Sequence, residues 1–186
     1  MKALVSLPTF AVVLFLDIIS KAVAVAVLSP AGIPRPVVGE WVRLALVYNP
    51  GAAFGFSLGP YSRGLFLALT AAALVVLAGM YRRTGADQLA RALALSLVAA
   101  GAAGNGIDRV RSPLGVVDFL DLGVGLHRWP TFNVADMAVT GGAALLAWVL
   151  WQEDRHLAAQ AAPAPAPAPA PAATATATSP SPPDLP

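Results

Sequence analysis

The sequence predicts an all-α membrane protein with four transmembrane helices, and two observations carry this prediction. Of the 186 residues, 57% are hydrophobic and 12% are charged, which is about half the charged fraction of a soluble domain. The apolar residues are also gathered into four long runs. Because the backbone groups inside a bilayer must satisfy one another, such continuous runs indicate helices.

Each of the four runs is close to the roughly 17–25 residues that a helix needs to cross the hydrocarbon core. They extend over about Leu7 to Leu28, Gly64 to Tyr81, Leu89 to Ile107 and Val134 to Trp151. The first run continues well beyond the apolar region of a typical signal peptide, so we expect it to remain as a transmembrane helix. We assign residues 1–157 to one four-helix membrane domain.

Basic residues near the ends of the runs bear on the orientation in the membrane. With four spans, Arg82, Arg83 and Arg91 lie in a short hairpin on the same side as both termini. The total number of basic residues is nearly equal on the two sides, but a dense group next to helix ends favours the cytoplasm. We therefore expect both termini to be cytoplasmic.

The segments outside the runs have their own patterns. Within residues 29–63, the stretch WVRLALVY is rich in β-branched and aromatic residues with partial alternation, which predicts a strand. Residues 108–133 are rich in glycine and proline, and we expect both segments to fold on the outer face. After about Ala158 the chain alternates alanine and proline, which blocks helix and supplies no core. Residues 158–186 are therefore expected to form a disordered cytoplasmic tail.

Composition and motifs limit the chemistry. The absence of cysteine removes disulfides, thiolate metal sites and a cysteine nucleophile, and a net charge of +2 is too small to indicate a nucleic-acid partner. His127 and His156 fall on opposite sides and no H-E-x-x-H motif occurs, so we expect no metal and no cofactor. Residues 55–59 match G-x-S-x-G, but a serine mechanism needs a histidine partner, and nothing around His127, the only histidine expected on the outer side, fixes that role.

Ionisable and amide side chains within apolar stretches of the sequence are costly in a membrane and often functional. Asp17 and Lys21 stand at i and i+4 of the first helix, as an internal ion pair or as part of a proton path. Asn105, Asp108 and Arg109 close the third run and face one cavity if the helix persists.

Two further acidic positions stand near the fourth run. Asn133 and Asp136 lie in its first turn, where amide caps and carboxylates are favoured. Asp118 stands alone in the middle of the apolar stretch VVDFL. Two facing aspartates can share one proton, so that one carboxylate activates water while the other donates a hydrogen bond to a carbonyl. That chemistry is an aspartic peptidase, although the carboxylate pair of a transporter would have the same pattern.

Four motifs resemble the signal peptidase II, or lipoprotein signal peptidase, family over roughly residues 10–152. They are LDIISK, NPGAAFGF, GNGIDRVRSPLGVVDFL and FNVADMAV. The resemblance implies an intramembrane aspartic endopeptidase of the bacterial cytoplasmic (inner) membrane, with its active site near the extracytoplasmic face. Its substrate would be a diacylglyceryl-modified prolipoprotein, cut just before the lipidated cysteine, and globomycin-type compounds would inhibit it.

The resemblance also implies roles for individual residues. It places the catalytic pair at Asp118 and Asp136, and structural roles at Asp17, Lys21 and Asp108. The substrate-binding residues that it implies are Asn49, Gly51, Phe54, Asn105, Arg109 and Asn133. An outer β-cradle would occupy residues 41–58, and the loop at residues 121–130 would shape a lid.

Two other functions remain open on the residues alone. A small proton-coupled transporter or a lipid-binding membrane protein would use the carboxylates for protons rather than for hydrolysis. A purely structural membrane protein would leave Asp118, Asn105, Arg109 and Asn133 without an explanation. The expected partners are prolipoprotein substrates and membrane lipids, and nothing in the sequence demands more than a monomer.

Overall fold

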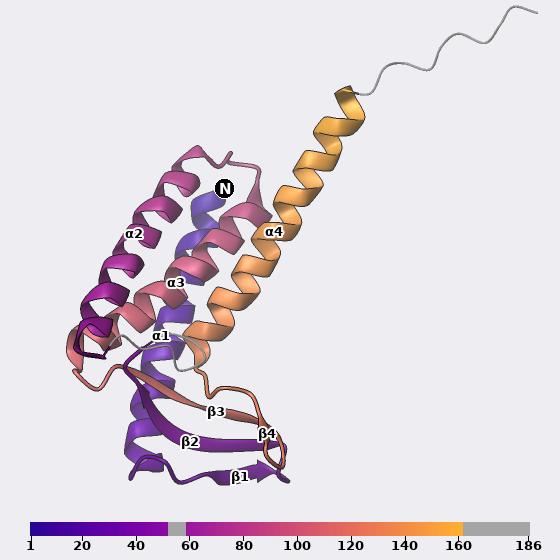
Figure 1. Ribbon diagram of the computed structural model, residues 1–186. Helices are drawn as coiled ribbons and strands as arrows, with labels where there is room; N and C mark the ends of the chain where they lie inside the picture. The colour runs from indigo at the N-terminus through magenta and orange to yellow at the C-terminus, as the bar shows by residue number, and fades with distance from the viewer. Residues whose placement is uncertain (52–58, 162–186) are drawn as a thin grey trace, which may run out of the picture.

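The computed structural model describes residues 1–51 and 59–161. Within these ranges it has four long helices, α1 (Lys2–Leu28), α2 (Ser62–Arg83), α3 (Leu89–Arg111) and α4 (Val134–Ala161). Each is long and apolar enough to cross a membrane, which confirms the expected four spans. A small sheet packs at one end of the bundle, and the N-terminus and the end of α4 lie toward the other (Figure 1).

All four helices extend beyond the apolar runs that predicted them. α3 continues past Ile107 to Arg111, so the polar residues of GNGIDR lie on a helix as expected. α4 continues past Trp151 to Ala161 and includes the first residues of the segment expected as a tail. Residues 162–186 lie outside the described residues, so the division of the chain near residue 158 stays a prediction.

α3 is the central helix of the bundle, since it packs against α1, α2 and α4. Small residues allow this close approach. A Cβ on Gly142 of α4 would lie 2.8 Å from side-chain atoms of Leu97 and Val98 on α3 and 2.9 Å from the backbone oxygen of Ala94. In contrast, α2 packs chiefly on α3. Among its described residues only Ser62 is buried, which leaves most of α2 facing lipid.

The sheet is antiparallel, with strands in the order β1 (Arg35–Val38), β2 (Val42–Asn49), β3 (Val116–Val124) and β4 (His127–Arg128). β2 is the strand expected from WVRLALVY. The expectation of a loop at residues 121–130 is wrong in part, because most of these residues form the β3–β4 hairpin. The register sets Asp118 opposite Val47 and Asp121 opposite Arg43.

The last turns of α1 hold the sheet to the bundle. Ala24 and Leu28 of α1 pack in one buried cluster with Leu46 of β2 and with Val117 and Phe119 of β3. Burial of this apolar surface contributes roughly 25 cal/mol per Å² and is the main reason that the strands stay at the helix ends. The backbone of β3 is thereby fixed relative to α1.

The chain after β4 returns along β3 before it enters α4. The Phe132 backbone N–H donates to the Leu120 oxygen at 3.0 Å, and the Leu120 N–H donates to the Phe132 oxygen at 2.8 Å. The entry to β3 is equally constrained, because Gly115 has φ +100° and a Cβ there would collide with the Asn49 backbone. These contacts bring the first turn of α4 beside the strand that carries Asp118.

The packing of α4 on α3 predicts opposite effects at two neighbouring glycines. Gly142→Ala places its Cβ against α3 and should lower the free energy of unfolding by about 1–3 kcal/mol. Gly141→Ala meets nothing within 4 Å and should be neutral or stabilising by up to about 1 kcal/mol, because alanine is the better helix former. Thermal unfolding of both variants in detergent tests this, and equal shifts would contradict the packing.

Candidate active site

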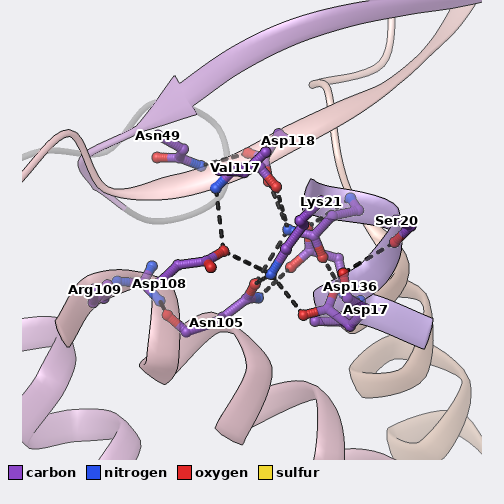
Figure 2. Close-up of polar contacts among 12 residues, drawn as sticks. Asp17, Ser20, Lys21, Asn49, Asn105, Asp108, Arg109, Val117, Asp118 and Asp136 are labelled. Carbon is purple, nitrogen blue, oxygen red and sulfur yellow. Dashed lines mark hydrogen bonds and ion pairs between the residues drawn. The ribbon is translucent and has the colours of Figure 1, made fainter. Parts of the chain in front are cut away.

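A cavity of about 520 Å³ lies where the sheet meets the ends of the helices. Its lining includes polar residues from four different elements: Asn49, Asn105, Arg109, Asp118 and Asp136. Figure 2 shows these side chains, with Asp17, Lys21 and Asp108, converging between the helix ends and the strands. Asp118 and Asp136, separated in the sequence by the β3–β4 hairpin, thus line one cavity.

Asp136 is held by the helix start that it helps to form. The Asn133 side-chain Oδ1 accepts the Asp136 N–H at 2.9 Å, and Asp136 Oδ2 accepts the Asn133 N–H at 3.2 Å. This is a reciprocal capping box, built here from Asn and Asp, at the N-terminus of α4. It satisfies two backbone donors and fixes the direction in which the Asp136 carboxylate points.

Asp118 is 2% exposed and is held by two side-chain amides. Asn133 Nδ2 donates to Asp118 Oδ1 at 2.7 Å, and Asn49 Nδ2 donates to Asp118 Oδ2 at 3.2 Å. The Asn49 amide is itself oriented, because its Oδ1 accepts the Gly51 N–H at 3.1 Å. Both oxygens of the Asp118 carboxylate therefore have a hydrogen-bond donor from a neutral group.

The Asn105 side chain of α3 contacts both Asp136 and the Asn133 amide that holds Asp118. Its Nδ2 donates to Asp136 Oδ1 at 2.8 Å, while its Oδ1 accepts from Asn133 Nδ2 at 3.1 Å. The same Oδ1 accepts from the Lys21 ammonium at 2.9 Å. The three asparagines therefore share one arrangement, in which the amide oxygen is held by a donor and the NH₂ group faces a carboxylate.

The pKa of Asp118 is raised from its ordinary value to about 7. Burial is the largest cause, and the negative charge of Asp136 adds to it, whereas the amides of Asn49 and Asn133 act in the opposite direction. A carboxyl with a pKa near 7 exchanges its proton at neutral pH. One protonated and one ionised carboxyl can therefore be present together, which is the state that acid–base hydrolysis requires.

Arg109 links α3 to the chain after β2. It is 9% exposed, donates through Nη2 to the Gly51 oxygen at 2.8 Å and lies 5.5 Å from the centre of the Phe66 ring. Its Nε lies buried without a hydrogen-bond partner among the described residues. Phe54, the remaining residue expected to bind substrate, lies outside the described residues.

The three residues expected to be structural form a charged cluster next to the asparagines. The Lys21 ammonium lies 2.8 Å from Asp17 Oδ2 and 2.8 Å from Asp108 Oδ2. Asp17 also accepts the Ala135 N–H of α4 at 2.9 Å, and Gly104 leaves room for its carboxylate, because a Cβ there would collide with Asp17. The expected ion pair between Asp17 and Lys21 is present. Both residues also contact other helices, because Lys21 contacts Asp108 of α3 and Asp17 contacts Ala135 of α4.

Sequence reasoning missed some of the residues that line the cavity. Thr140 lies four residues after Asp136, so helical periodicity alone would have placed it on the same face. Trp129 and Phe132 also line the cavity, but they reach it through the return of the chain along β3, which no local pattern indicates. Within residues 1–51 and 59–161, no group of three His, Cys, Asp or Glu side chains could hold a metal ion.

Comparison with known proteins decides the family. The family model described as signal peptidase (SPase) II matches residues 9–152. The chain belongs to the signal peptidase II family. This is a family of aspartic peptidases, so the peptidase expected from the motifs is confirmed at the level of the family, and nothing found favours a transporter.

Individual relatives agree with this assignment. The chain is 45% identical over 122 residues to a protein named lipoprotein signal peptidase from Geobacter metallireducens, covering 64% of this chain and 74% of that protein. It is 41% identical over 139 residues to one of the same name from Polynucleobacter necessarius, covering 74% and 83%. A solved bacterial membrane enzyme superimposes with a TM-score of 0.72 at 30% identity, covering 80% of this chain and 88% of that one.

The pKa of Asp118 predicts how stability depends on pH. Between its ordinary value of about 4 and about 7, the folded protein holds a proton that the unfolded chain releases. This contribution to stability is complete below pH 4 and is lost as the pH rises through 7. The Tm of Asp118→Asn, which cannot ionise, should therefore rise relative to that of the parent from pH 5 to pH 8.

Asp121→Asn is a matched control on the same strand. Burial alone would raise the pKa of Asp121, but the hydrogen bonds and charges of Arg128 and Arg43 together lower it. Its stabilising effect is thus present at every pH above its ordinary value. The loss of Tm in Asp121→Asn should be constant from pH 5 to pH 8, and a Tm difference for Asp118→Asn that is equally constant would contradict the assignment.

Proposed function

We propose that the chain is an intramembrane endopeptidase that cuts diacylglyceryl-modified prolipoproteins just before the lipidated cysteine, with Asp118 and Asp136 as the catalytic pair. One observation carries this proposal. Two carboxylates from different elements line a single cavity at the outer ends of four apolar helices, each held by neutral amides. The family assignment supplies the reaction, and the names of the relatives suggest lipoproteins as the substrate class.

The geometry supports a division of labour within the pair. Asp118, with its pKa raised to about 7, carries the shared proton and donates it as a hydrogen bond to the scissile carbonyl oxygen. Asp136, which receives the N–H groups of Asn105 and Asn133, is the ionised partner that takes a proton from water. The water oxygen adds to the carbonyl carbon and gives a neutral gem-diol, while Asp118 is left ionised and Asp136 protonated.

Breakdown of the gem-diol completes the balance. Asp136 returns a proton to the amide nitrogen that leaves with the cysteine, and the C–N bond breaks. Asp118 takes back a proton from a gem-diol hydroxyl, which becomes part of the new carboxyl group of the signal peptide. The pair ends with one proton, as it began, and water is the only co-reactant.

The remaining residues of the cavity are assigned to substrate binding. Asn49 and Asn133 orient Asp118, and Asn49, which lines the cavity, is proposed to contact the peptide backbone next to the scissile bond. The buried guanidinium of Arg109, with its free Nε, supplies a donor for a substrate carbonyl. Gly51 and Phe54 are proposed to contact substrate as well. The apolar cavity wall of Val116, Phe132 and Val139 suits the lipid-bearing residue.

The membrane context is part of the proposal. We place the protein in the bacterial inner membrane with both termini in the cytoplasm and the sheet outside. The basic groups at the ends of α2 and α3 support this orientation, since Arg82, Arg83 and Arg91 lie at the end of the bundle opposite the sheet. We further propose that the chain acts as a monomer surrounded by membrane lipids and that globomycin-type compounds bind in the cavity.

Cleavage by purified protein tests the function directly. A diacylglyceryl-modified prolipoprotein in detergent should be converted to the mature form by the parent. Asp118→Asn and Asp136→Asn should each lower the rate by at least about 10³-fold, because a single carboxyl cannot act as both acid and base. Asp121→Asn, which alters an acid of β3 outside the cavity, should keep the rate if the protein is folded. Cleavage that survives in either dyad variant would overturn the catalytic assignment.

The absence of cysteine makes the orientation testable with single introduced thiols. Leu126, in the β3–β4 turn, is 97% exposed, and Ala86, in the hairpin between α2 and α3, is also exposed. In spheroplasts, a membrane-impermeant maleimide should label Leu126→Cys at once and Ala86→Cys only after permeabilisation, while the parent stays unlabelled. The reverse pattern would place the sheet in the cytoplasm.

A further inference from the structure

Lys21 is a buried cation that takes no part in the mechanism above. It stands on the inner face of α1 and is 3% exposed. Its family motif and its i, i+4 spacing with Asp17 account for an ion pair between neighbouring turns of one helix. The contacts of its ammonium go beyond that pair and reach the neighbours of both catalytic carboxylates (Figure 2).

The lysine ammonium has three N–H donors and no acceptor, and here three acceptors surround it. They are Asp17 Oδ2 at 2.8 Å, Asp108 Oδ2 at 2.8 Å and Asn105 Oδ1 at 2.9 Å. Asn105 Oδ1 accepts a hydrogen bond from the ammonium, and the two carboxylates form ion pairs with it. Because Lys21 is 3% exposed and does not line the cavity, it acts on the reaction through these partners and through its charge rather than by contact with substrate.

Two donors, the Lys21 ammonium and Asn133 Nδ2, hold the Asn105 oxygen and determine which way that amide faces. An NH₂ group turned toward the ammonium would set donor against donor, so only the oxygen can face Lys21. The NH₂ group is then directed at Asp136 Oδ1, 2.8 Å away. For Asn49 and Asn133 a backbone N–H holds the amide oxygen in the same manner. Lys21, together with Asn133 Nδ2, holds the Asn105 oxygen as the backbone holds the other two.

The contact with Asp108 reaches the other carboxylate. Asp108 Oδ2, which lies against the Lys21 ammonium, also accepts the Val117 N–H of β3 at 3.3 Å. Val117 directly precedes Asp118 in the strand. The same ammonium thus ties the end of α3 to the backbone that carries the second catalytic residue.

We propose that Lys21 is a positioning residue for peptide hydrolysis, which turns the Asn105 amide toward Asp136 and holds Asp108 against the strand that carries Asp118. The inference rests on the proposed function, since it takes Asp118 and Asp136 as the reacting pair. Asp17 has a different role, because its second oxygen accepts the Ala135 N–H. It ties α1 to α4 and balances the charge of Lys21.

The chain offers a matched control for testing Lys21. Lys2, the other lysine of the chain, lies on the same helix and donates from its ammonium to the backbone oxygens of Tyr81 and Thr84, at the opposite end of the bundle. Lys21→Met and Lys2→Met remove the same charge and the same donors from α1. Both can lower the Tm, but only Lys21→Met should alter the chemistry.

The expected signature is a split between kcat and KM. Against a diacylglyceryl-modified prolipoprotein, Lys21→Met should lower kcat by about 10- to 100-fold, the range found when an outer hydrogen-bond partner is lost at metal sites. KM should stay within about twofold, because Lys21 does not line the cavity. Lys2→Met should leave both constants of the folded protein unchanged.

The pH profile is the readout that a merely structural role would not move. The charged groups that act on Asp118 are Asp136 from α4, Lys21 from α1 and Arg109 from α3. Asp17 from α1 and Asp108 from α3 contact Lys21. The charge of Lys21 lowers the pKa of Asp118 against burial and Asp136. Its removal should therefore move the limb of the kcat profile that reports Asp118 to higher pH in Lys21→Met, and the profile of Lys2→Met should coincide with that of the parent.

A double-mutant cycle tests the route through Asn105. If Lys21 acts largely by orienting that amide, Lys21→Met should cost less kcat in an Asn105→Ala background than in the parent. Full multiplication of the two losses, or a pH profile of Lys21→Met identical to that of the parent, would overturn the inference. If Lys21→Met is not monodisperse, the same criteria apply to Lys21→Gln, which keeps two N–H donors and loses the charge.

The proposed function and the positioning role of Lys21 can fail separately. If the parent does not cleave the prolipoprotein, the proposed function is wrong, and if Asp118→Asn or Asp136→Asn still cleaves it, the catalytic assignment is wrong. If the parent cleaves, the dyad variants do not, and Lys21→Met behaves as Lys2→Met does, the proposed function stands and the positioning role of Lys21 is wrong.

Discussion

A carboxylate removed from water needs hydrogen-bond donors, and the kind of donor decides what the carboxylate can do. Two acids of β3 show the difference. Asp121 is held by the guanidinium groups of Arg43 and Arg128, which lower its pKa and keep it ionised as a fixed anchor of the strands. Asp118, three residues earlier, is held by neutral amides and has a pKa of about 7. Amide donors satisfy its oxygens without a compensating charge, so its proton remains exchangeable.

The fold brings these amides together from separate elements. Asn49 comes from the end of β2, Asn105 from α3 and Asn133 from the start of α4. Three features each set one of these positions: the buried cluster between α1 and the sheet, the close packing of α4 on α3, and the return of the chain along β3. No single element holds the site, which explains why the cavity lies at their junction rather than within the bundle.

Hydropathy was sufficient to predict the four helices, because backbone satisfaction in lipid leaves no other structure for such runs. It did not predict their ends, since the helical hydrogen bonds of α4 continue through polar residues to Ala161. The strand β2 could be predicted from its β-branched residues. The pairing of β3 with β4 was not predicted, because glycines interrupt the strand pattern of this hairpin. At the site, local reasoning singled out Asn105, Asp118, Asn133 and Asp136, but the role of Asn49 came from the family resemblance. The contact between Lys21 and Asn105 joins two separate helices without any local signal, and only the packing of α1 on α3 reveals it.

The pairing of Asp118 with Val47 makes the enzyme unusually dependent on strand alignment. Successive residues of a strand point to opposite faces, so a slip of β3 by one position would carry Asp118 out of the cavity and bring in an apolar neighbour, Val117 or Phe119. The helices, which are held by their own packing, would remain in place. A misaligned strand would therefore remove one member of the proposed catalytic pair from the cavity without altering the transmembrane helices, a defect that membrane-insertion assays would not detect.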